Sequence, residues 1–261
     1  MEGARLLTGA TDGIGLALAR RWRGQHHRTL YHGRRSFSDL EGLGTSEQRL
    51  FDSGSYIQVD LADPAALERF PLALNERGIE GLSLLVLNAG MGWWGRPAEQ
   101  SGESIGEVVQ VNLLAAMRLC HLLLPRLEKV HGRIVYISSV AAFLPCPDFA
   151  VYAAAKAAAD GFFRSLRVEL EGEVEVQVIR PGAVRTEMHR KCGIPPGQIA
   201  TQRFPTPEAI AQRIDKLLHG PPVWRVLGAG NKAIGALGRN LPRLVERLQA
   251  KRGLAERGPG E

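Results

Sequence analysis

A tyrosine, a lysine and a serine in the middle of the chain have the types and spacing needed to move a proton. Tyr152 and Lys156 are four residues apart in an alanine-rich stretch, and a helix would place both side chains on one face. A free phenol has a pKa of about 10, and a nearby ammonium group favours the phenolate, so Tyr152 can serve as an acid or a base at neutral pH. Ser139 ends a predicted strand and can reach the same site. The alternatives are a surface pair and a strand-end turn.

Three glycines near the start of the chain have the spacing of an anion-binding turn. Gly9, Gly13 and Gly15 lie in the segment TGATDGIG, between a short apolar stretch and a helical pattern. Glycines permit a tight turn and a close approach of the backbone to a pyrophosphate, and the N-terminus of the following helix favours the anion. The spacing G-x-x-x-G-x-G differs from G-x-G-x-x-G and also suits a simple turn. Its position between a strand and a helix favours a dinucleotide site.

The second predicted strand ends in Gly33, Arg34 and Arg35. NAD enzymes tend to place an acidic residue here to bind the ribose 2′-hydroxyl, whereas an arginine suits a 2′-phosphate. A guanidinium group can bind a phosphate through two hydrogen bonds. The sequence therefore predicts NADP(H) in preference to NAD(H), the alternative being a solvated arginine pair on a loop.

Strand and helix patterns alternate along the chain and define the elements that must position these residues. The predicted strands are 5–8, 29–32, 56–59, 82–87, 132–138, 174–179 and 223–227. The predicted helices are 16–23, 63–77, 102–127, 149–170, 207–219 and 241–249. Continuous apolar runs suit strands that are buried on both faces. Repeated βαβ units predict an α/β fold, a doubly wound parallel sheet with helices on both faces and ligands at the carboxyl ends of the strands.

Composition bounds the class of protein. The chain has 261 residues, 44% apolar and 23% charged, which is enough to bury a sizeable core and excludes a disordered chain. Without a linker or repeat, residues 1–252 are predicted to form one nucleotide-binding domain and 253–261 a flexible tail. The three cysteines form no disulfide or zinc pattern, which predicts a reducing, cytoplasmic location. We expect no signal peptide and no membrane span, since no apolar run approaches roughly 18–20 residues.

Other chemistries lack their motifs. The 7 histidines show no metal-ligand spacing, so we predict no metal site and assign them surface or packing roles. Ser139 is not part of a G-x-S-x-G elbow, which excludes a hydrolase nucleophile of that type. The net charge of +6 comes mostly from scattered arginines without a nucleic-acid reading motif, so no nucleic-acid partner is predicted.

Together these motifs resemble the short-chain dehydrogenase/reductase family, in its shorter, single-domain form. The resemblance covers about residues 4–190 and depends on TGxxxGxG at 8–15, Asn88-Ala89-Gly90, Asn112, Ser139, Tyr152-xxx-Lys156 and Pro181-Gly182. It implies a Rossmann-type sheet of about seven parallel strands. It also implies hydride transfer between NAD(P)H and a carbonyl or alcohol.

The resemblance further implies a role for each matching residue. Tyr152 would be the general acid in reduction and the base in oxidation, Lys156 would lower its pKa and bind the nicotinamide ribose, and Ser139 would polarise the substrate oxygen. Asn112 would hold a water that links Lys156 to solvent. Cofactor contacts are expected from Gly9, Thr11, Asp12, Gly13, Ile14, Gly15, Gly33, Arg34, Arg35, Asp60, Leu61, Asn88, Ala89, Gly90, Tyr152, Lys156, Pro181, Gly182, Val184 and Thr186.

Substrate choice is expected to come from apolar residues on the least patterned segments. The expected pocket residues are Trp93, Trp94, Phe143, Phe149 and Met188. The tryptophans could equally cap the core or face another subunit. Residues 187–205 are predicted to form a substrate loop that acts as a mobile lid, the alternative being an ordinary long loop.

We therefore predict an NADP(H)-dependent oxidoreductase, a carbonyl reductase for a ketone or aldehyde, with alcohol oxidation as the reverse reaction. The alternative is a non-catalytic NADP-binding sensor or scaffold on the same fold. The resemblance implies a homodimer or homotetramer formed through the helices around 103–127 and 150–170. The basic C-terminal helix is predicted to pack on its own subunit or a partner, with an anionic membrane surface as the alternative.

Overall fold

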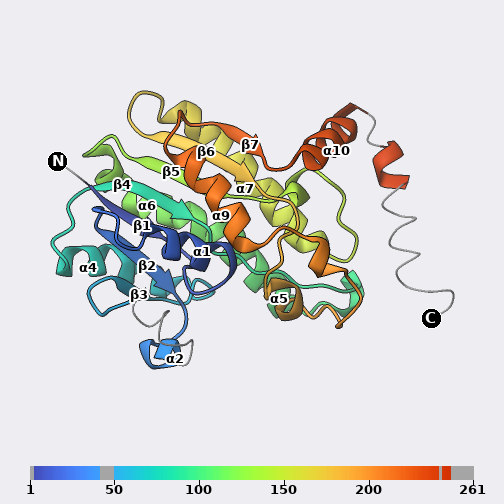
Figure 1. Ribbon diagram of the computed structural model, residues 1–261, viewed down its shortest axis with the longest axis horizontal. Helices are drawn as coiled ribbons and strands as arrows, with labels where there is room; N and C mark the ends of the chain where they lie inside the picture. The colour runs from blue at the N-terminus through green and yellow to red at the C-terminus, as the bar shows by residue number, and fades with distance from the viewer. Residues whose placement is uncertain (1–2, 42–49, 241–242, 248–261) are drawn as a thin grey trace.

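One parallel sheet organises the molecule (Figure 1). The computed structural model describes residues 3–41, 50–240 and 243–247. Its seven strands lie in the order β3-β2-β1-β4-β5-β6-β7, and every pairing is parallel. The strands are β1 (Ala4–Leu7), β2 (Thr29–Gly33), β3 (Tyr56–Gln58), β4 (Leu82–Leu87), β5 (Arg133–Ile137), β6 (Glu175–Arg180) and β7 (Trp224–Val226). The order reverses between β1 and β4, which confirms the predicted doubly wound, Rossmann-type fold.

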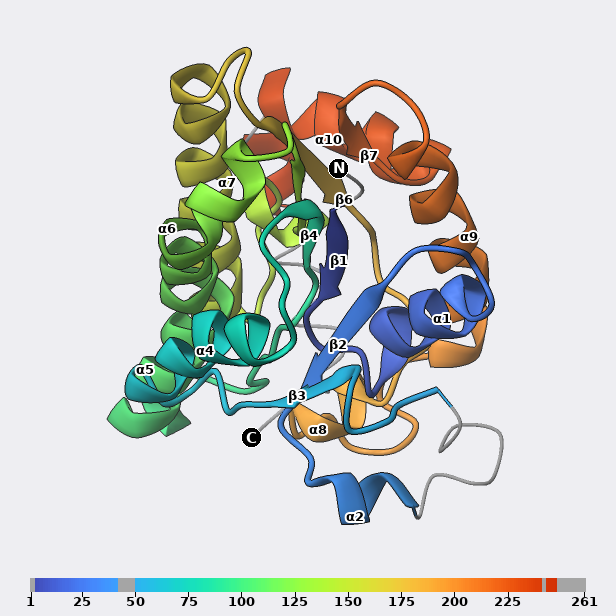
Figure 2. The same ribbon diagram turned by 90° about the vertical axis from the view of Figure 1, so that its left-hand side faces the viewer.

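Helices cover both faces of the sheet. Figure 2 shows α4, α5, α6 and α7 on one side and α1 and α9 on the other. The helices are α1 (Gly13–Trp22), α2 (Phe37–Glu41), α4 (Arg69–Glu76), α5 (Gly102–Val109), α6 (Ala115–Glu128), α7 (Ala150–Glu169), α8 (Met188–Lys191), α9 (Pro207–Leu218) and α10 (Ala229–Asn240).

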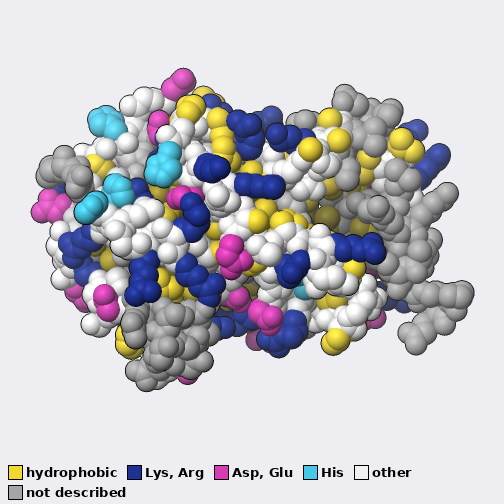
Figure 3. Space-filling model, in the orientation of Figure 1, with side chains coloured by type: hydrophobic (Ala, Val, Ile, Leu, Met, Phe, Trp, Pro, Cys, Tyr) yellow, Lys and Arg dark blue, Asp and Glu magenta, His cyan; other side chains and the backbone are white. Residues whose placement is uncertain are grey.

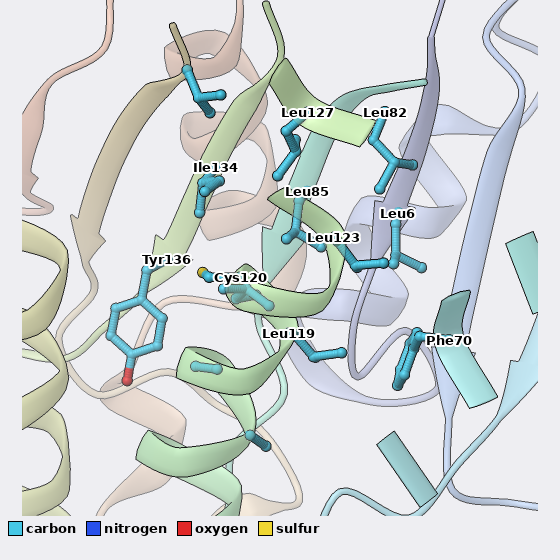
Figure 4. Packing of buried hydrophobic residues seen from close by; sticks show 14 of the residues in the cluster. Leu6, Phe70, Leu82, Leu85, Leu119, Cys120, Leu123, Leu127, Ile134 and Tyr136 are labelled. Atoms are coloured by element: carbon cyan, nitrogen blue, oxygen red, sulfur yellow. The ribbon is translucent and has the colours of Figure 1, made fainter. Parts of the chain in front are cut away.

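The alternation of side chains along each strand divides the core into two layers. Leu6, Leu85, Ile134 and Tyr136 point to the side of α6, where they pack with its leucines (Figure 4). The residues next to them in each strand point to the opposite side and pack with Trp22 of α1 and with α9. Successive strand residues face opposite sides of a sheet, so continuous apolar runs are what this arrangement requires.

The predicted helix 102–127 is interrupted. The structure has α5, one wider π-helical turn at Gln110–Leu114, and then α6. The Asn112 side chain lies in this turn and donates hydrogen bonds to the carbonyl oxygens of Val108, at 2.8 Å, and Met91, at 2.7 Å. A single wide turn in a helix is often found at a functional site, and here it turns Asn112 toward the end of β4.

Two further helix predictions need correction. The stretch 63–77 forms a 3₁₀ helix at Ala65–Glu68 followed by α4, because Pro71 lacks the N–H needed to continue an unbroken helix across this point. Helix α10 was not predicted, since its glycines obscure the apolar pattern. Of the helix predicted at 241–249, residues 243–247 are described and helical, and the predicted tail at 253–261 lies outside the described residues.

The stretch Gly102–Glu128 is long and apolar enough to meet the length and hydropathy test for a membrane span, with a mean hydropathy of 1.5 in its most apolar window. In the structure 44% of that window is buried. Its α6 portion packs on β4 and supplies core residues such as Leu119 and Leu123. This is the packing of a core helix beside a parallel sheet.

Candidate active site

The polar motifs meet at one edge of the sheet. The glycine loop follows β1, Asn88 follows β4, Ser139 follows β5 and Pro181 follows β6. These four strands are neighbours in the sheet, and parallel strands all end at the same edge. The motifs therefore lie side by side at the point where α/β sheets of this type bind their ligands.

Close backbone contacts fix the shape of the glycine loop. Gly9 and Gly13 have positive φ angles of 66° and 51°, which residues with a Cβ rarely adopt. A Cβ on Gly15 would collide with the Gly9 carbonyl oxygen and would lie 2.6 Å from Nδ2 of Asn88. The Asn88 amide donates hydrogen bonds to the carbonyl oxygens of Thr8, at 3.0 Å, and Gly9, at 3.2 Å. The three glycines therefore permit a tight turn in which backbone groups and neighbouring side chains approach closely.

Helix α1 begins directly after this loop. The Asp12 carboxylate accepts a hydrogen bond from the Gly13 N–H at 2.6 Å and also pairs with Lys191 of α8. The Thr186 methyl group would lie 3.0 Å from a Cβ on Gly13. The segment that follows β6 therefore lies against the first turn of α1. Ile14 is partly buried in the core below that turn.

The end of β2 presents two arginines beside the glycine loop. A Cβ on Gly33 would lie 2.6 Å from the side chains of both Thr11 and Tyr56, so this strand end packs directly on the loop. Arg34 is exposed and Arg35 is half-buried. The Arg35 guanidinium reaches the Thr11 carbonyl oxygen at 3.5 Å, and its own carbonyl accepts a hydrogen bond from the Tyr56 hydroxyl at 2.8 Å.

Asp60 and Leu61, both among the expected cofactor contacts, follow β3. Asp60 is exposed and accepts a hydrogen bond from the Ala62 N–H at 3.0 Å. Leu61 is buried, and its carbonyl oxygen accepts a hydrogen bond from Gln110 at 3.1 Å. A Cβ on Gly9 would lie 2.8 Å from Cα of Ala89, so the strand ends of β1 and β4 are in close contact.

Tyr152 and Lys156 lie on α7 and face the end of β5. The Lys156 ammonium group donates a hydrogen bond to the Ile137 carbonyl oxygen at 3.0 Å and lies 5.9 Å from the centre of the Tyr152 ring. The Ser139 hydroxyl lies close enough to the Tyr152 hydroxyl to lower the pKa of Tyr152. Ser139 also accepts a hydrogen bond from the Ala141 N–H at 3.1 Å, so it caps the short turn after β5 while facing Tyr152. The structure brings the three predicted side chains together.

Burial has the largest effect on the pKa values of Tyr152 and Lys156. It raises the pKa of Tyr152 to about 12, although the Ser139 hydroxyl opposes that rise. It lowers the pKa of Lys156 to about 8, although the Asp160 carboxylate opposes that fall. The expectation that Lys156 lowers the pKa of Tyr152 stays a prediction. The Tyr152 hydroxyl is protonated at neutral pH.

Asn112 and Lys156 converge at Gly90. A Cβ on Gly90 would lie 2.9 Å from Oδ1 of Asn112 and 3.7 Å from Nζ of Lys156. Oδ1 is buried and accepts no hydrogen bond from any residue that the structure describes. The Tyr136 hydroxyl holds the turn in place by donating to the Asn112 carbonyl oxygen at 3.0 Å. A buried acceptor of this kind suits an ordered water between Asn112 and Lys156.

The turn after β6 packs against the turn that carries Ser139. The Pro181 carbonyl accepts a hydrogen bond from the Val140 N–H at 3.0 Å, which ties this turn to the Ser139 turn. Gly182 lies so close to the Asn231 side chain that a Cβ would be 2.9 Å from its Cγ. Val184 is buried, and its carbonyl contacts the His189 ring at 3.0 Å.

The five predicted pocket residues do not form one group. A Cβ on Gly92 would lie 3.4 Å from Met188 and 3.6 Å from Phe149, and the Phe149 and Tyr152 rings are 6.2 Å apart, so Met188 and Phe149 are near the tyrosine. Trp94 joins α8 through its backbone, donating to the Cys192 carbonyl at 2.9 Å.

The other two side chains line separate cavities. Trp93 lines one of about 60 Å³ together with Ile105 and Val151. Phe143 packs against Gly235 of α10 and lines another of about 330 Å³, which Ala153 and Val245 also line.

Sequence reasoning missed Cys192 at this site, whereas Cys146 lies close to Tyr152 in the sequence and is expected there as a packing residue. Cys192 lies 2.9 Å from the position of a Cβ on Gly92, and both Cys192 and Cys146 interact electrostatically with Tyr152. Burial raises the pKa of Cys192 to about 11 and raises that of Cys146, so both are neutral thiols at pH 7. A single cysteine on a loop gives no signal of its neighbours, which only the packing of α8 against the end of β4 reveals.

The chain matches known proteins over most of its length. The family model of the short-chain dehydrogenases matches residues 4–194. A serine 3-dehydrogenase from Agrobacterium fabrum is 36% identical over 72% of this chain and 74% of its own length. A short-chain dehydrogenase from Sphingobium yanoikuyae in complex with NADPH is 26% identical, with a TM-score of 0.76 over 93% of this chain and 95% of that one.

A second solved structure, a short-chain dehydrogenase/reductase from Burkholderia phymatum in complex with NAD, shares the fold, with 19% identity and a TM-score of 0.79 over 93% of this chain and 95% of that one. Nucleotides with and without the 2′-phosphate thus occur among proteins of this fold. The sheet order, the gathered motifs and these similarities establish that the chain belongs to the short-chain dehydrogenase family, as an oxidoreductase acting on CH–OH and C=O groups.

Proposed function

We propose that the protein is an NADP(H)-dependent carbonyl reductase in which Tyr152 is the general acid. One observation supports this above all: Tyr152, Lys156, Ser139 and Asn112 come from three elements and converge, with the free Oδ1 of Asn112 and the ammonium group of Lys156 both facing Gly90. A buried acceptor that no described residue pairs, beside a buried lysine, suits an ordered water in a path for protons.

The nucleotide fits the described residues. The glycine loop lacks Cβ atoms where the backbone must approach a pyrophosphate, and the N-terminus of α1 begins there. Arg34 and Arg35 lie beside the loop at the end of β2, where a 2′-phosphate would need two cations. The relative complexed with NADPH supports this preference. When bound, the reduced nicotinamide supplies the hydride.

The side chains of this protein supply the proton and the orientation. Ser139 donates a hydrogen bond to the substrate carbonyl oxygen and places it beside the Tyr152 hydroxyl. As hydride reaches the carbonyl carbon, Tyr152 transfers its proton to the oxygen, and the product is the alcohol. A protonated tyrosine can donate this proton at neutral pH.

Tyr152 must then regain its proton. Lys156 supplies the nearest positive charge and attracts the phenolate as it forms. A water on Oδ1 of Asn112 would connect Lys156 to solvent beside the exposed Gly90. Ile137 holds the ammonium group in place through its carbonyl oxygen, 3.0 Å away.

The surroundings of Tyr152 favour an apolar carbonyl compound. Phe149, Met188 and Cys192 present an aromatic ring, a thioether and a neutral thiol near its ring. None of the three carries a charge that would pair with an ionised substrate. We include residues 187–205 in the substrate site as its loop, since α8 lies against both the glycine loop and the end of β4.

We further propose a homodimer or homotetramer in the cytoplasm. Exposed apolar side chains on α5 and α7, Ile105 and Val168, and Leu114 in the turn between α5 and α6 favour a subunit contact on this face. The thiols of Cys120, Cys146 and Cys192 are all free, which suits a reducing compartment. The positive and negative side chains seen in Figure 3 are interspersed, with no single basic block on that face.

The test is NADPH oxidation with a panel of small apolar ketones, aldehydes and quinones, for the wild type and for Tyr152→Phe. We expect turnover by the wild type and a loss of about 10²- to 10⁴-fold in the variant, because the general acid is absent. The dissociation constant for NADPH should be nearly unchanged. Equal turnover by both proteins would refute the role of Tyr152, and NADPH binding without any turnover would favour a sensor.

A further inference from the structure

A buried histidine joins the glycine loop to the end of β2. His32 is 2% exposed, and its Nδ1 accepts a hydrogen bond from the Gly9 N–H at 3.3 Å. Its Nε2 lies 3.0 Å from the Val59 carbonyl oxygen, and its ring packs on Phe70 of α4, with 5.1 Å between ring centres. The sequence-based assignment of His32 to a surface or packing role is therefore incomplete.

The two hydrogen bonds determine the tautomer of the His32 ring. A backbone N–H only donates and a carbonyl oxygen only accepts, so Nδ1 carries no proton and Nε2 carries one. The ring is neutral, and burial lowers its pKa to about 4 in spite of the Asp60 carboxylate and the Val59 carbonyl. Both nitrogens of this buried ring thus form hydrogen bonds, Nδ1 with the glycine loop and Nε2 with the end of β3.

The peptide groups of Gly9 are held by side chains from two different strands. Its N–H donates to His32, the next-to-last residue of β2, and its carbonyl oxygen accepts from Asn88, which follows β4. The next N–H, of Ala10, donates to the His32 backbone carbonyl at 2.8 Å. Gly9 has a positive φ, which glycine adopts without strain, and because glycine has many allowed conformations these contacts select one of them.

This arrangement also connects the two halves of the proposed nucleotide site. Gly33 follows His32 and packs on Thr11, and the arginines proposed for the 2′-phosphate come directly after it. A shift of the His32 ring would therefore move the loop that faces the pyrophosphate relative to the strand end that carries Arg34.

We propose that His32 is a positioning residue for dinucleotide binding, whose Nδ1 holds the Gly9 peptide in the orientation that the bound nucleotide requires. The proposal rests on the proposed function, since it assumes that the glycine loop binds a dinucleotide. His32 itself is buried behind the loop and touches the loop backbone.

Two amide substitutions separate the two hydrogen bonds of the ring. The oxygen of asparagine can occupy the place of Nδ1, so His32→Asn keeps the acceptor for the Gly9 N–H and loses the donor to Val59. The amide nitrogen of glutamine can occupy the place of Nε2, so His32→Gln keeps the Val59 bond and loses the Gly9 bond. Both variants lose the ring packing on Phe70, which makes them matched controls for each other.

The experiment is a titration of both variants and the wild type with NADPH and NADH, followed by tryptophan fluorescence. We expect His32→Asn to bind within about twofold of the wild type and His32→Gln to bind about five- to tenfold more weakly, the value of one hydrogen bond. The loss should be similar for both nucleotides, because the pyrophosphate is common to them. In turnover assays KM for NADPH should rise in His32→Gln while kcat stays constant.

Equal dissociation constants for the two variants would overturn the proposal while leaving the proposed function intact. Failure of the folded wild type to bind either nucleotide would instead remove the proposed function. Nitrogen-15 spectra of the wild-type His32 ring give a check that needs no variant and no nucleotide. They should show an unprotonated Nδ1 and a protonated Nε2, and the reverse tautomer would also overturn the proposal.

Discussion

The neutral state of His32 predicts a specific dependence of stability on pH. In the unfolded chain the His32 ring has its ordinary pKa of 6.5. In the folded protein burial lowers this pKa to about 4. Between these values only the unfolded state is protonated, so stability is lost as the pH falls through this window and is fully present above it. The interval corresponds to about 3 kcal/mol of unfolding free energy.

The assay is urea unfolding of the wild type and His32→Asn, followed by circular dichroism from about pH 7.5 to about pH 4.5. The variant lacks the ring packing on Phe70 and the hydrogen bond to Val59, so we expect it to be the less stable protein at the higher pH. It cannot bind this proton, so it should lose less stability on acidification. The difference in unfolding free energy between the wild type and His32→Asn should change by about 2–3 kcal/mol over this pH range. His121→Asn, on the exposed side of α6, controls for the removal of a surface histidine. Parallel curves for wild type and His32→Asn would refute a buried neutral ring.

Two further predictions concern the nucleotide site. Arg34→Ala combined with Arg35→Ala should weaken NADPH binding by about tenfold or more and leave NADH binding nearly unchanged, because charge-assisted hydrogen bonds to a phosphate are lost. Isothermal titration with both nucleotides checks this, and equal losses would contradict the role of the pair. Gly15→Ala should lower stability by about 1–3 kcal/mol and abolish nucleotide binding, since its Cβ would meet the loop backbone. The matched control Gly161→Ala, in α7 with open space around it, should gain up to about 1 kcal/mol in urea unfolding, and similar results for the two alanines would contradict the packing argument.

The strands and the main site residues could be predicted because local patterns determine them. The run LSLLVL at Leu82–Leu87 is apolar at nearly every position, as a strand buried on both faces must be, and it forms β4 over those same residues. The glycine loop, Ser139 and Tyr152 each have a sequence signature beside a strand end or helix start. The rule that parallel strands end together then brings them to one edge.

The remainder depends on contacts between distant residues. The π turn around Asn112 is associated with a hydrogen bond to Met91, 21 residues earlier, which no local periodicity reveals. Helix α10 contains glycines that lower its helical propensity, and its Gly235 packs against Phe143 from a loop far back in the chain. A polar residue in a buried strand was the available signal for His32, but its partner Gly9 could be named only once the strands were placed side by side.

The most direct test of the account is a parallel titration of the folded wild-type protein with NADPH and NADH, with tryptophan fluorescence as the readout and carbonyl turnover measured on the same sample. The chain has 4 tryptophans, of which Trp93 and Trp94 follow the end of β4. We predict that NADPH binds at least about tenfold more tightly than NADH and supports turnover of an apolar carbonyl compound. Equal binding of the two nucleotides would contradict the roles of Arg34 and Arg35, and binding of neither would contradict the nucleotide site at Gly9, Gly13 and Gly15.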